Sequence, residues 1–384
     1  MKSFPGFPRR DSGKKRGRKG FLLAFERIRY EGLVELSAAV LEKLGYPAHK
    51  ARITAVVLAE ADARGVSSHG VTRLKVYRNE LEGGHVKPGA DPEIVHETPI
   101  SLVVDGHYGV GAHISEFTMK RAIEKAKAHG TCYASVRNSN HFGMAGLWAE
   151  MAVKEGLLGS AFTNTIRCAV PTLGKERLLG TNPIAVGIPS DGDLPWLLDM
   201  ATTTAPRGKL GVYKRRNLEM PEGWFVGESG ETVTDPSEAT SILADPTGRW
   251  GGLLFLGGAG ELMGGHKGYG LAVLVDMLCG PLAGGPWTRD VFQTMDANVG
   301  HFFSATRLDL FGDEKDIRRR VGDMLSALRS SAPSEGNERV YVHGEKESLR
   351  RKEALESGVP LDDATFRMLK DFAAEFGLTP PEKA

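Results

Sequence analysis

Helical periodicity dominates the two ends of the chain. Apolar residues recur there at steps of three and four positions, which is the pattern of the buried stripe on an amphipathic helix. Clusters of glycine and proline separate the helical segments. The expected helices fall within 27–74, 313–330, 346–357 and 361–375. We therefore predict that helices from both ends of the chain pack together into one domain.

The middle of the chain changes to short apolar runs that alternate with helical segments. These runs predict strands at 94–96, 101–105, 133–136, 157–163, 183–188 and 196–200, with a further short strand at 340–342. Helical patterns occupy 112–129, 144–155 and 267–283, and the last is mostly apolar, so it is expected to be buried. This order of elements predicts an α/β fold (α+β in its overall composition).

The element order also predicts the domain organisation. Residues 25–95 together with 286–384 would form the helical domain, and residues 96–285 the α/β domain. The stretch 204–236, rich in glycine and proline, is expected to be an irregular excursion from that domain. Residues 1–24 begin with a basic stretch that has no apolar signal-peptide core, and we expect a disordered extension there.

Composition and charge narrow the possible partners and the compartment. The 384 residues carry a net charge of +1, which gives no reason to expect nucleic acid or a membrane surface as a partner. No apolar run reaches the roughly 18–20 residues that span a bilayer. The three cysteines, Cys132, Cys168 and Cys279, lack the spacing of a metal site. They favour reduced thiols in a cytoplasmic protein, and no metal site is predicted.

Several motifs that identify common enzyme classes are absent. A dinucleotide-binding Rossmann domain usually carries GxGxxG between a strand and a helix. Here Gly258 and Gly260 are followed by Met263 at the third glycine position. The sequence also contains no GxxxxGK[ST], HExxH or GxSxG motif. A Rossmann domain is therefore disfavoured.

The segment from Ser67 to Arg73 holds the first candidate for chemistry. If Ser67-Ser68 caps a helix that starts at Ser68, then His69, Arg73 and Tyr77 lie on one face. Reduction of a 2-oxo acid needs a planar, two-pronged donor for the carboxylate and a proton donor for the carbonyl oxygen, and Arg and His supply these groups. The spacing alone favours a capped surface helix with an exposed arginine and a hydrogen-bonded histidine.

Other polar segments lie at the ends of predicted strands or at the start of a helix. They are Asn138–Gly143 with His141, Gly180–Pro183, Leu198–Thr203 and Gly265–Gly270 with Lys267. Backbone amides, hydroxyls and a lysine at such positions can hold phosphate, ribose or a nicotinamide amide. Each segment alone also fits a turn, a helix cap or close helix packing.

The order of these segments carries more information than any single spacing. The series SSHGVTRL, NSNHFGMAG, LLGTNPIAVGIP, LLDMATT, GGHKGYGLAVLVDML, NVGHFF and VHGEKE resembles the malate/L-lactate dehydrogenase family. This non-Rossmann family also includes ureidoglycolate and sulfolactate dehydrogenases, diketogulonate enzymes and cyclic-imine carboxylate reductases. The resemblance covers about residues 27–375.

The resemblance implies a fold, an activity and an assembly. A non-Rossmann α/β middle domain would bind NAD or NADP, and a helical domain formed by both termini would pack against it. The enzyme would transfer hydride between the cofactor and a small 2-hydroxy or 2-oxo acid such as malate or lactate. It would act as a homodimer with active sites near the subunit interface.

Site residues follow from the resemblance motif by motif. His69 would be the acid/base residue, Arg73 would bind the carboxylate, Ser68 would support them, and His141 would stand near nicotinamide and substrate. Some family members use the histidine at the position of His141 as the base instead. The cofactor would contact His141, Thr181, Asn182, Leu198, Asp199, Met200, Ala201, Thr202, Thr203, His266, Lys267, Gly344 and Glu345.

Some positions depart from the family pattern, and other functions stay open. His343 replaces a usual proline before Gly344, Lys175 replaces a second glycine after Gly174, and residues 1–20 have no counterpart. One alternative is a reductase of a cyclic 2-imino carboxylate, or a dehydrogenase of the ureidoglycolate or sulfolactate type. The others are a metal-dependent hydrolase and a binding protein without catalytic activity.

Overall fold

The structure is a computed structural model that describes residues 25–245, 248–294 and 296–384. The predicted disordered extension at 1–24 lies outside the described residues. Within them, no helix is both long enough and apolar enough to cross a membrane.

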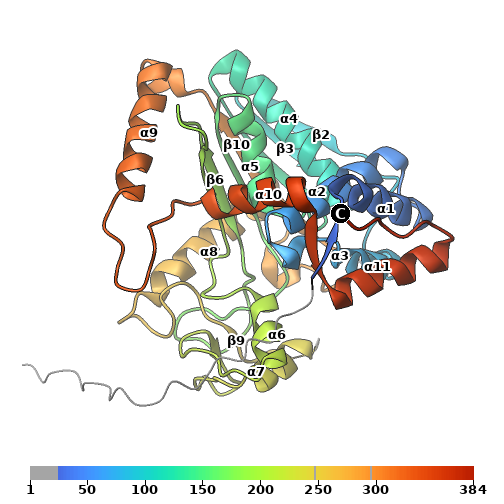
Figure 1. The fold of residues 1–384 in the computed structure, drawn as a ribbon. Helices are drawn as coiled ribbons and strands as arrows, with labels where there is room; N and C mark the ends of the chain where they lie inside the picture. The colour runs from blue at the N-terminus through green and yellow to red at the C-terminus, as the bar shows by residue number, and fades with distance from the viewer. Residues whose placement is uncertain (1–24, 246–247, 295) are drawn as a thin grey trace, which may run out of the picture.

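A mixed β-sheet occupies the centre of the molecule (Figure 1). In the described residues its seven strands lie in the order β2 (Glu93–Thr98), β3 (Ser101–Asp105), β4 (Thr131–Ser139), β10 (Val299–Thr306), β5 (Leu158–Thr163), β6 (Ile184–Ile188) and β7 (Trp196–Met200). Only β3 and β4 run parallel, and helix α4 (Gly111–His129) connects them. A parallel pair needs such a crossover, whereas the antiparallel pairs can be joined by loops.

The two faces of this sheet are covered unequally. Alternate residues of β10, Phe303 and Ala305, join the main core, to which α4 and α5 (Ala145–Lys154) also contribute. Phe302 faces the other way, into a small cluster with side chains of α8 (Gly265–Cys279). That second face stays partly open, since Tyr133 on β4 is 48% exposed.

Helices from both ends of the chain pack beside the sheet (Figure 1). They are α1 (Tyr30–Lys43), α2 (Ala48–Ala63), α3 (Arg73–Glu82), α10 (Glu345–Ser357) and α11 (Asp363–Phe376). Two short strands, β1 (Phe25–Ile28) and β11 (Val359–Asp362), pair antiparallel and tie the two ends together. Helix α9 (Glu314–Arg329) lies apart from this group at the other side of the molecule (Figure 1).

The excursion predicted to be irregular is more ordered than expected. It contains α6 (Arg207–Arg215) and β8 (Phe225–Val226), and α7 (Pro236–Ala244) and β9 (Gly252–Leu253) follow. Buried side chains of these elements share one hydrophobic cluster. The hydrophobic periodicity does not predict these elements because they are short and separated by glycine and proline.

Three other expectations from the sequence are wrong. Strand β10 lies at the centre of the sheet, although 286–384 was assigned to the helical domain. Its residues are buried on both faces, so the alternation that marks a strand is absent. Residues 340–342 form no strand. Helix α8 is not fully buried, because Leu274 and Met277 are 47% and 58% exposed.

Candidate active site

A large cavity opens between the helical elements, one end of the sheet and the α6 segment. Its volume is about 1300 Å³. Ser68, His69 and Arg73 line it from the helical side, and His141 from the end of β4. Residues 341–344, Lys346 and Glu347 line it from the start of α10 and the segment before that helix. Small-molecule pockets usually measure about 300–1,000 Å³, so this cavity has room for more than a small acid.

The segment that carries His69 is shaped by a buried carboxyl group. Asp62, at the end of α2, accepts the Val71 N–H at 2.7 Å. A side chain on Gly70 would collide with that carboxyl group, which explains the glycine in the SHG sequence. Burial raises the pKa of Asp62 to about 7. The turn after His69 is therefore held by a contact from inside the core.

One part of the predicted local structure is wrong here. Ser67–His69 form a short 3-10 turn, Gly70 is extended, and α3 begins only at Arg73. These residues nevertheless contact one another: the Ser68 Oγ lies 2.9 Å from His69 Nδ1, and the Arg73 Nε donates to the Ser68 backbone carbonyl at 2.9 Å. The carbonyl contact uses Nε and leaves the terminal nitrogens of Arg73 for a ligand.

His69 and His141 stack against each other, although one comes from the helical elements and the other from the loop after β4. Their ring centroids are 5.5 Å apart. Tyr77, on α3, brings its hydroxyl to 2.8 Å from His141 Nδ1, and the Gly143 N–H also points at Nδ1, at 3.3 Å. A backbone N–H can only donate, so Nδ1 carries no proton and Tyr77 donates to it as well. The proton of the neutral imidazole is then on Nε2, which can donate to a ligand.

Burial keeps both imidazoles neutral at neutral pH. Burial, with the nearby Arg73 charge, lowers the pKa of His69 to about 4. The pKa of His141 is also well below its ordinary value, for the same two reasons and because of His69. Burial of a cationic imidazole without a carboxylate partner has this effect.

Arg73 is the cation of this part of the cavity. No ion pair among the described residues involves it. Glu80, one further turn along α3, also lines the cavity, and burial raises its pKa to about 7. An arginine that faces a cavity without a carboxylate partner is suited to bind an anionic ligand.

Part of the predicted cofactor set lines the cavity. These residues are His141, Thr181, Asp199, Met200, Ala201, Thr203 and Gly344. Asp199 accepts the Gly146 N–H at 2.7 Å, and burial raises its pKa to about 6. Gly344 has a left-handed backbone, and a side chain there would collide with Leu197. The turn at Gly344 therefore forms although His343 stands at the preceding position.

The other predicted cofactor residues do not line the cavity. They are Asn182, Leu198, Thr202, Glu345, His266 and Lys267. Asn182 donates to the Ala272 carbonyl of α8, and Thr202 donates to the Thr181 carbonyl. Glu345 forms ion pairs with two arginines of the C-terminal part of the chain. His266 and Lys267 are exposed at the start of α8.

The structure adds residues that the sequence did not single out as part of the site. Tyr77 was placed on the same helix face as Arg73 but received no role. Three further cations, Arg207, Arg215 and Lys346, line the cavity. Their signal in the sequence is weak, because lysine and arginine in loops and short helices are usually solvated side chains.

The chemistry of the lining fits a nicotinamide dinucleotide. Phosphates need cations or backbone donors, which the three cations can supply. Ribose and amide groups need hydroxyls and exposed backbone, which the threonines and the turn at Gly344 offer. The aliphatic lining includes Ala201, Leu197 and Met200. The volume, the cations and the polar lining therefore agree with one large anionic ligand beside the histidine pair.

Comparison with known proteins identifies the family and the fold. The sequence profile of the malate/L-lactate dehydrogenase family matches residues 28–370. The chain is 40% identical to the malate dehydrogenase of Pyrococcus abyssi over 356 residues, which are 92% of this chain and 96% of that protein. It is 34% identical to the L-sulfolactate dehydrogenase of Methanocaldococcus jannaschii, over 91% of this chain and 97% of that protein.

A solved structure shows the same architecture. The malate dehydrogenase of Entamoeba histolytica superposes with a TM-score of 0.88 at 33% identity, over 93% of this chain and 99% of that chain. The fold and the site define an oxidoreductase that uses a nicotinamide cofactor. The chain belongs to the malate/L-lactate dehydrogenase family, which confirms the predicted family, fold and activity on 2-hydroxy acids.

Proposed function

We propose that the protein interconverts a small 2-hydroxy acid and its 2-oxo acid in this cavity, and that the preferred substrate carries a second anionic group, as malate does. The observation that carries the proposal is the meeting of His69, Arg73 and His141 at one wall of a cavity large enough for a dinucleotide. Malate and sulfolactate, in the names of the relatives, each carry an anionic group besides the 2-carboxylate.

In this proposal each residue at the wall has a separate task. Arg73 binds the 2-carboxylate through its terminal nitrogens and so orients the 2-carbon. His141 donates from Nε2 to the substrate oxygen and stabilises the charge that develops there. His69 accepts the hydroxyl proton during oxidation and returns it during reduction. Ser68 orients His69 through the contact with Nδ1.

The cofactor would lie along the rest of the cavity. When bound, it supplies or accepts the hydride at the 2-carbon. Thr181, Thr203 and the backbone around Met200 and Gly344 would hold its sugar and amide groups, and the cavity cations its phosphates. Asn182, Thr202 and Glu345 would act by positioning these segments, since their side chains bond within the protein.

A substrate panel with NADH and with NADPH tests this function. We expect oxidation of either reduced cofactor with oxaloacetate or sulfopyruvate at a higher kcat/KM than with pyruvate. Equal or higher kcat/KM with pyruvate would contradict the preference for a second anionic group. Turnover of a cyclic 2-imino carboxylate alone would overturn the proposed hydroxy acid substrate in favour of an imine reductase.

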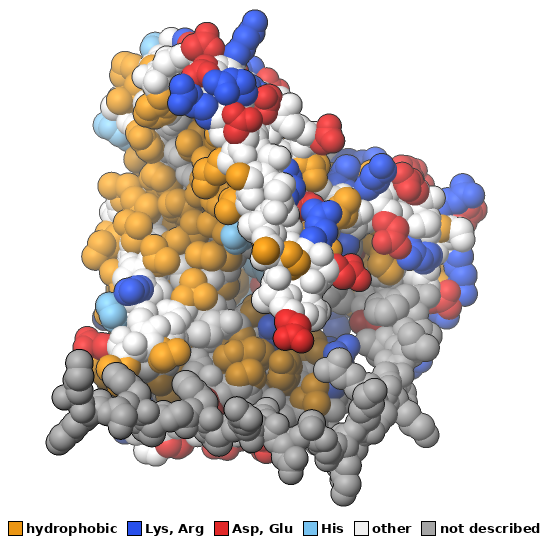
Figure 2. All heavy atoms as spheres, turned by 60° about the vertical axis from the view of Figure 1, so that its left-hand side comes forward, with side chains coloured by type: hydrophobic (Ala, Val, Ile, Leu, Met, Phe, Trp, Pro, Cys, Tyr) orange, Lys and Arg blue, Asp and Glu red, His pale blue; other side chains and the backbone are white. Residues whose placement is uncertain are grey.

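We also propose that the enzyme forms a homodimer through the open side of the sheet. Leu271, Leu274, Met277 and Leu282, on α8 and the turn after it, are 36–58% exposed. Figure 2 shows that hydrophobic side chains gather over this side of the molecule. Contiguous apolar surface of this kind marks an interaction site. His266 and Lys267, at the start of α8, would then lie at the subunit interface.

Light scattering coupled to size-exclusion chromatography tests the proposed homodimer. Met277→Asp places a charge in the middle of this surface and should convert the dimer to a monomer, whereas the matched change Met324→Asp, on exposed α9, should leave it intact. A wild-type monomer at micromolar concentration would contradict the assembly. The cytoplasm is the compartment we propose, because all three cysteines are free and buried.

A further inference from the structure

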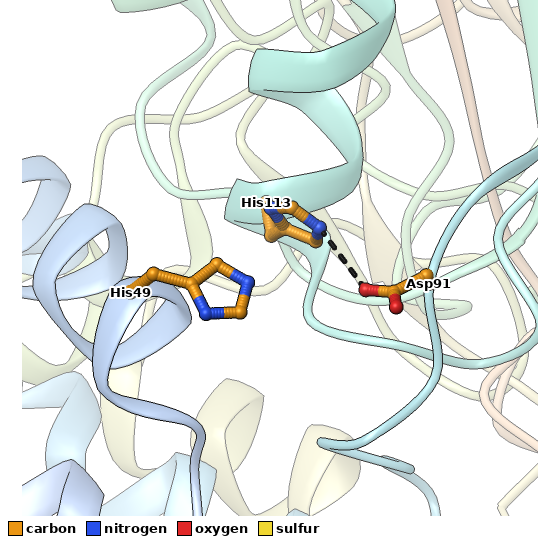
Figure 3. A group of neighbouring side chains, drawn as sticks. All are labelled: His49, Asp91 and His113. Carbon is orange, nitrogen blue, oxygen red and sulfur yellow. Dashed lines mark ion pairs between the residues drawn. The ribbon is translucent and has the colours of Figure 1, made fainter.

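Two histidines and an aspartate meet at a corner of the molecule outside the cavity. His49 lies in the first turn of α2, His113 in the first turn of α4, and Asp91 in the segment before β2 (Figure 3). One ligand atom from each residue lies within 4.8 Å of the other two. His113 Nε2 is 3.4 Å from Asp91 Oδ1, and the two imidazole rings meet edge to face.

A buried lysine fixes the position of this carboxylate. Lys50 is almost fully buried, and its Nζ lies 2.7 Å from Asp91 Oδ1. The same Nζ donates to the carbonyls of Pro88 and Ala90, at 3.1 and 2.7 Å. Lys50 and His113 both contact Oδ1, so Oδ2 remains for another ligand. The side chain of Asp91 is 72% exposed, so this oxygen can be reached from solvent.

We propose that His49, Asp91 and His113 bind a divalent transition-metal ion such as Zn²⁺, with water completing the coordination. Two imidazole nitrogens and one carboxylate oxygen are typical zinc donors. Zinc bonds of about 2.0–2.1 Å in a tetrahedron need donor atoms roughly 3.3 Å apart. The His113 and Asp91 donors already lie 3.4 Å apart. His49 is exposed, so it can close the remaining gap of up to about 1.5 Å without disturbing the core.

Three features make this site weaker than a structural zinc site. The Lys50 charge already neutralises Asp91, and the positive ends of α2 and α4 oppose a second cation. His113 Nδ1 is buried without a hydrogen-bond partner, and ligand histidines that lack such a partner lose about 10–100-fold in affinity. We therefore expect a Kd on the order of 1–10 µM rather than the nanomolar or lower values of zinc fingers.

A metal ion at this corner would join two parts of the fold. Helix α2 belongs to the helical elements, and α4 covers the sheet. Gly111, at the start of α4, packs so closely on the carbonyls of Asn140 and His141 that a side chain there would collide with them. The ion would thus stabilise the corner behind His141 without touching the cavity. It should therefore raise the melting temperature and leave kcat nearly unchanged.

The experiment measures Zn²⁺ binding by calorimetry and the melting temperature with and without Zn²⁺, for the wild type and two variants. His49→Gln removes an exposed ligand and should fold normally. His129→Gln, at the exposed end of α4, is the matched control. We expect one micromolar site in the wild type and in His129→Gln, a rise of several degrees in their melting temperatures, and at least a tenfold loss of affinity in His49→Gln.

Co²⁺ provides a second readout and separates this site from the histidines of the cavity. Cobalt bound by two imidazoles and a carboxylate in a tetrahedron gives intense visible absorption, which His49→Gln and His113→Gln should abolish. Metal bound at His69 and His141 would inhibit turnover and survive His49→Gln. Equal affinity in the wild type and His49→Gln, or no binding at 100 µM Zn²⁺, would overturn the proposal.

Discussion

Two pairs of histidines in this molecule are built in similar ways, since each joins side chains from two different elements of the fold. In the cavity, His69 comes from the helical elements and His141 from the end of β4. At the corner, His49 comes from α2 and His113 from α4. The cavity pair is half-buried beside an arginine, whereas in the corner pair His49 is exposed and Asp91 provides a carboxylate.

The surroundings decide what each pair can do. Imidazoles half-buried beside Arg73 stay neutral, and Tyr77 and Gly143 fix which nitrogen of His141 carries the proton. Such a pair can donate hydrogen bonds and exchange a proton with an anionic substrate. Imidazoles beside Asp91 can instead share a cation with it. The same residue type thus serves proton transfer or metal binding according to charge and burial.

Removing a histidine from the cavity pair should have the largest effect. His69→Ala should lower kcat by on the order of 10²–10⁴, because the proton then has no positioned acceptor. His49→Gln, in the corner pair, should leave kcat unchanged. Steady-state kinetics in both directions measure this. If His141→Ala abolishes turnover while His69→Ala retains it, the roles of His69 and His141 are exchanged.

The arginine beside the cavity pair gives the next largest effect. Arg73→Lys keeps the charge but loses the two-pronged donor, so kcat/KM should fall about 10–100-fold, the equivalent of one charge-assisted hydrogen bond. Cofactor affinity, measured by quenching of protein fluorescence, should stay within about twofold. Arg121→Lys, on the exposed face of α4, is the matched control for Arg73→Lys. Lys50→Arg is unsuitable as a control because Lys50 is fully buried. Unchanged kcat/KM at low substrate would refute the carboxylate role.

A smaller effect should follow when His141 loses one of the two hydrogen bonds that fix its tautomer. Tyr77→Phe removes one of two donors to Nδ1, and kcat should fall about 3–10-fold, the range of a single neutral hydrogen bond. Nitrogen NMR of labelled histidine should show a defined Nε2–H tautomer in the wild type and a mixture in the variant. A structural role alone would lower the melting temperature without changing that spectrum.

The smallest change to measure is the protonation of His69 itself. Its pKa is about 4, so the neutral form is present above this pH and is lost as the pH falls through it. In an NMR titration of the ligand-free protein, the His69 signal should therefore stay neutral from about pH 8 to about pH 5, and His69→Gln identifies the signal. Titration near pH 6.5, the ordinary value for histidine, would show that the site is more solvated than the structure has it.

The sequence by itself determined the class of protein and most of its elements. Helices at both ends, alternating elements between them and colinear motifs around His69, His141 and Gly344 identify the family, because local periodicity and short motifs are properties of neighbouring residues. The sequence pattern did not predict the central position of β10, since a strand buried on both faces shows no alternation of apolar and polar residues.

Only the tertiary structure decided how distant residues meet. Tyr77 lies 64 positions from His141 and yet sets its tautomer. His49, Asp91 and His113 belong to three separate segments, and no spacing in the sequence connects them. Likewise, Arg207, Arg215 and Lys346 share one cavity only because α6 and the start of α10 fold against the same end of the sheet. Contacts of this kind depend on packing between elements, which periodicity along a single element does not encode.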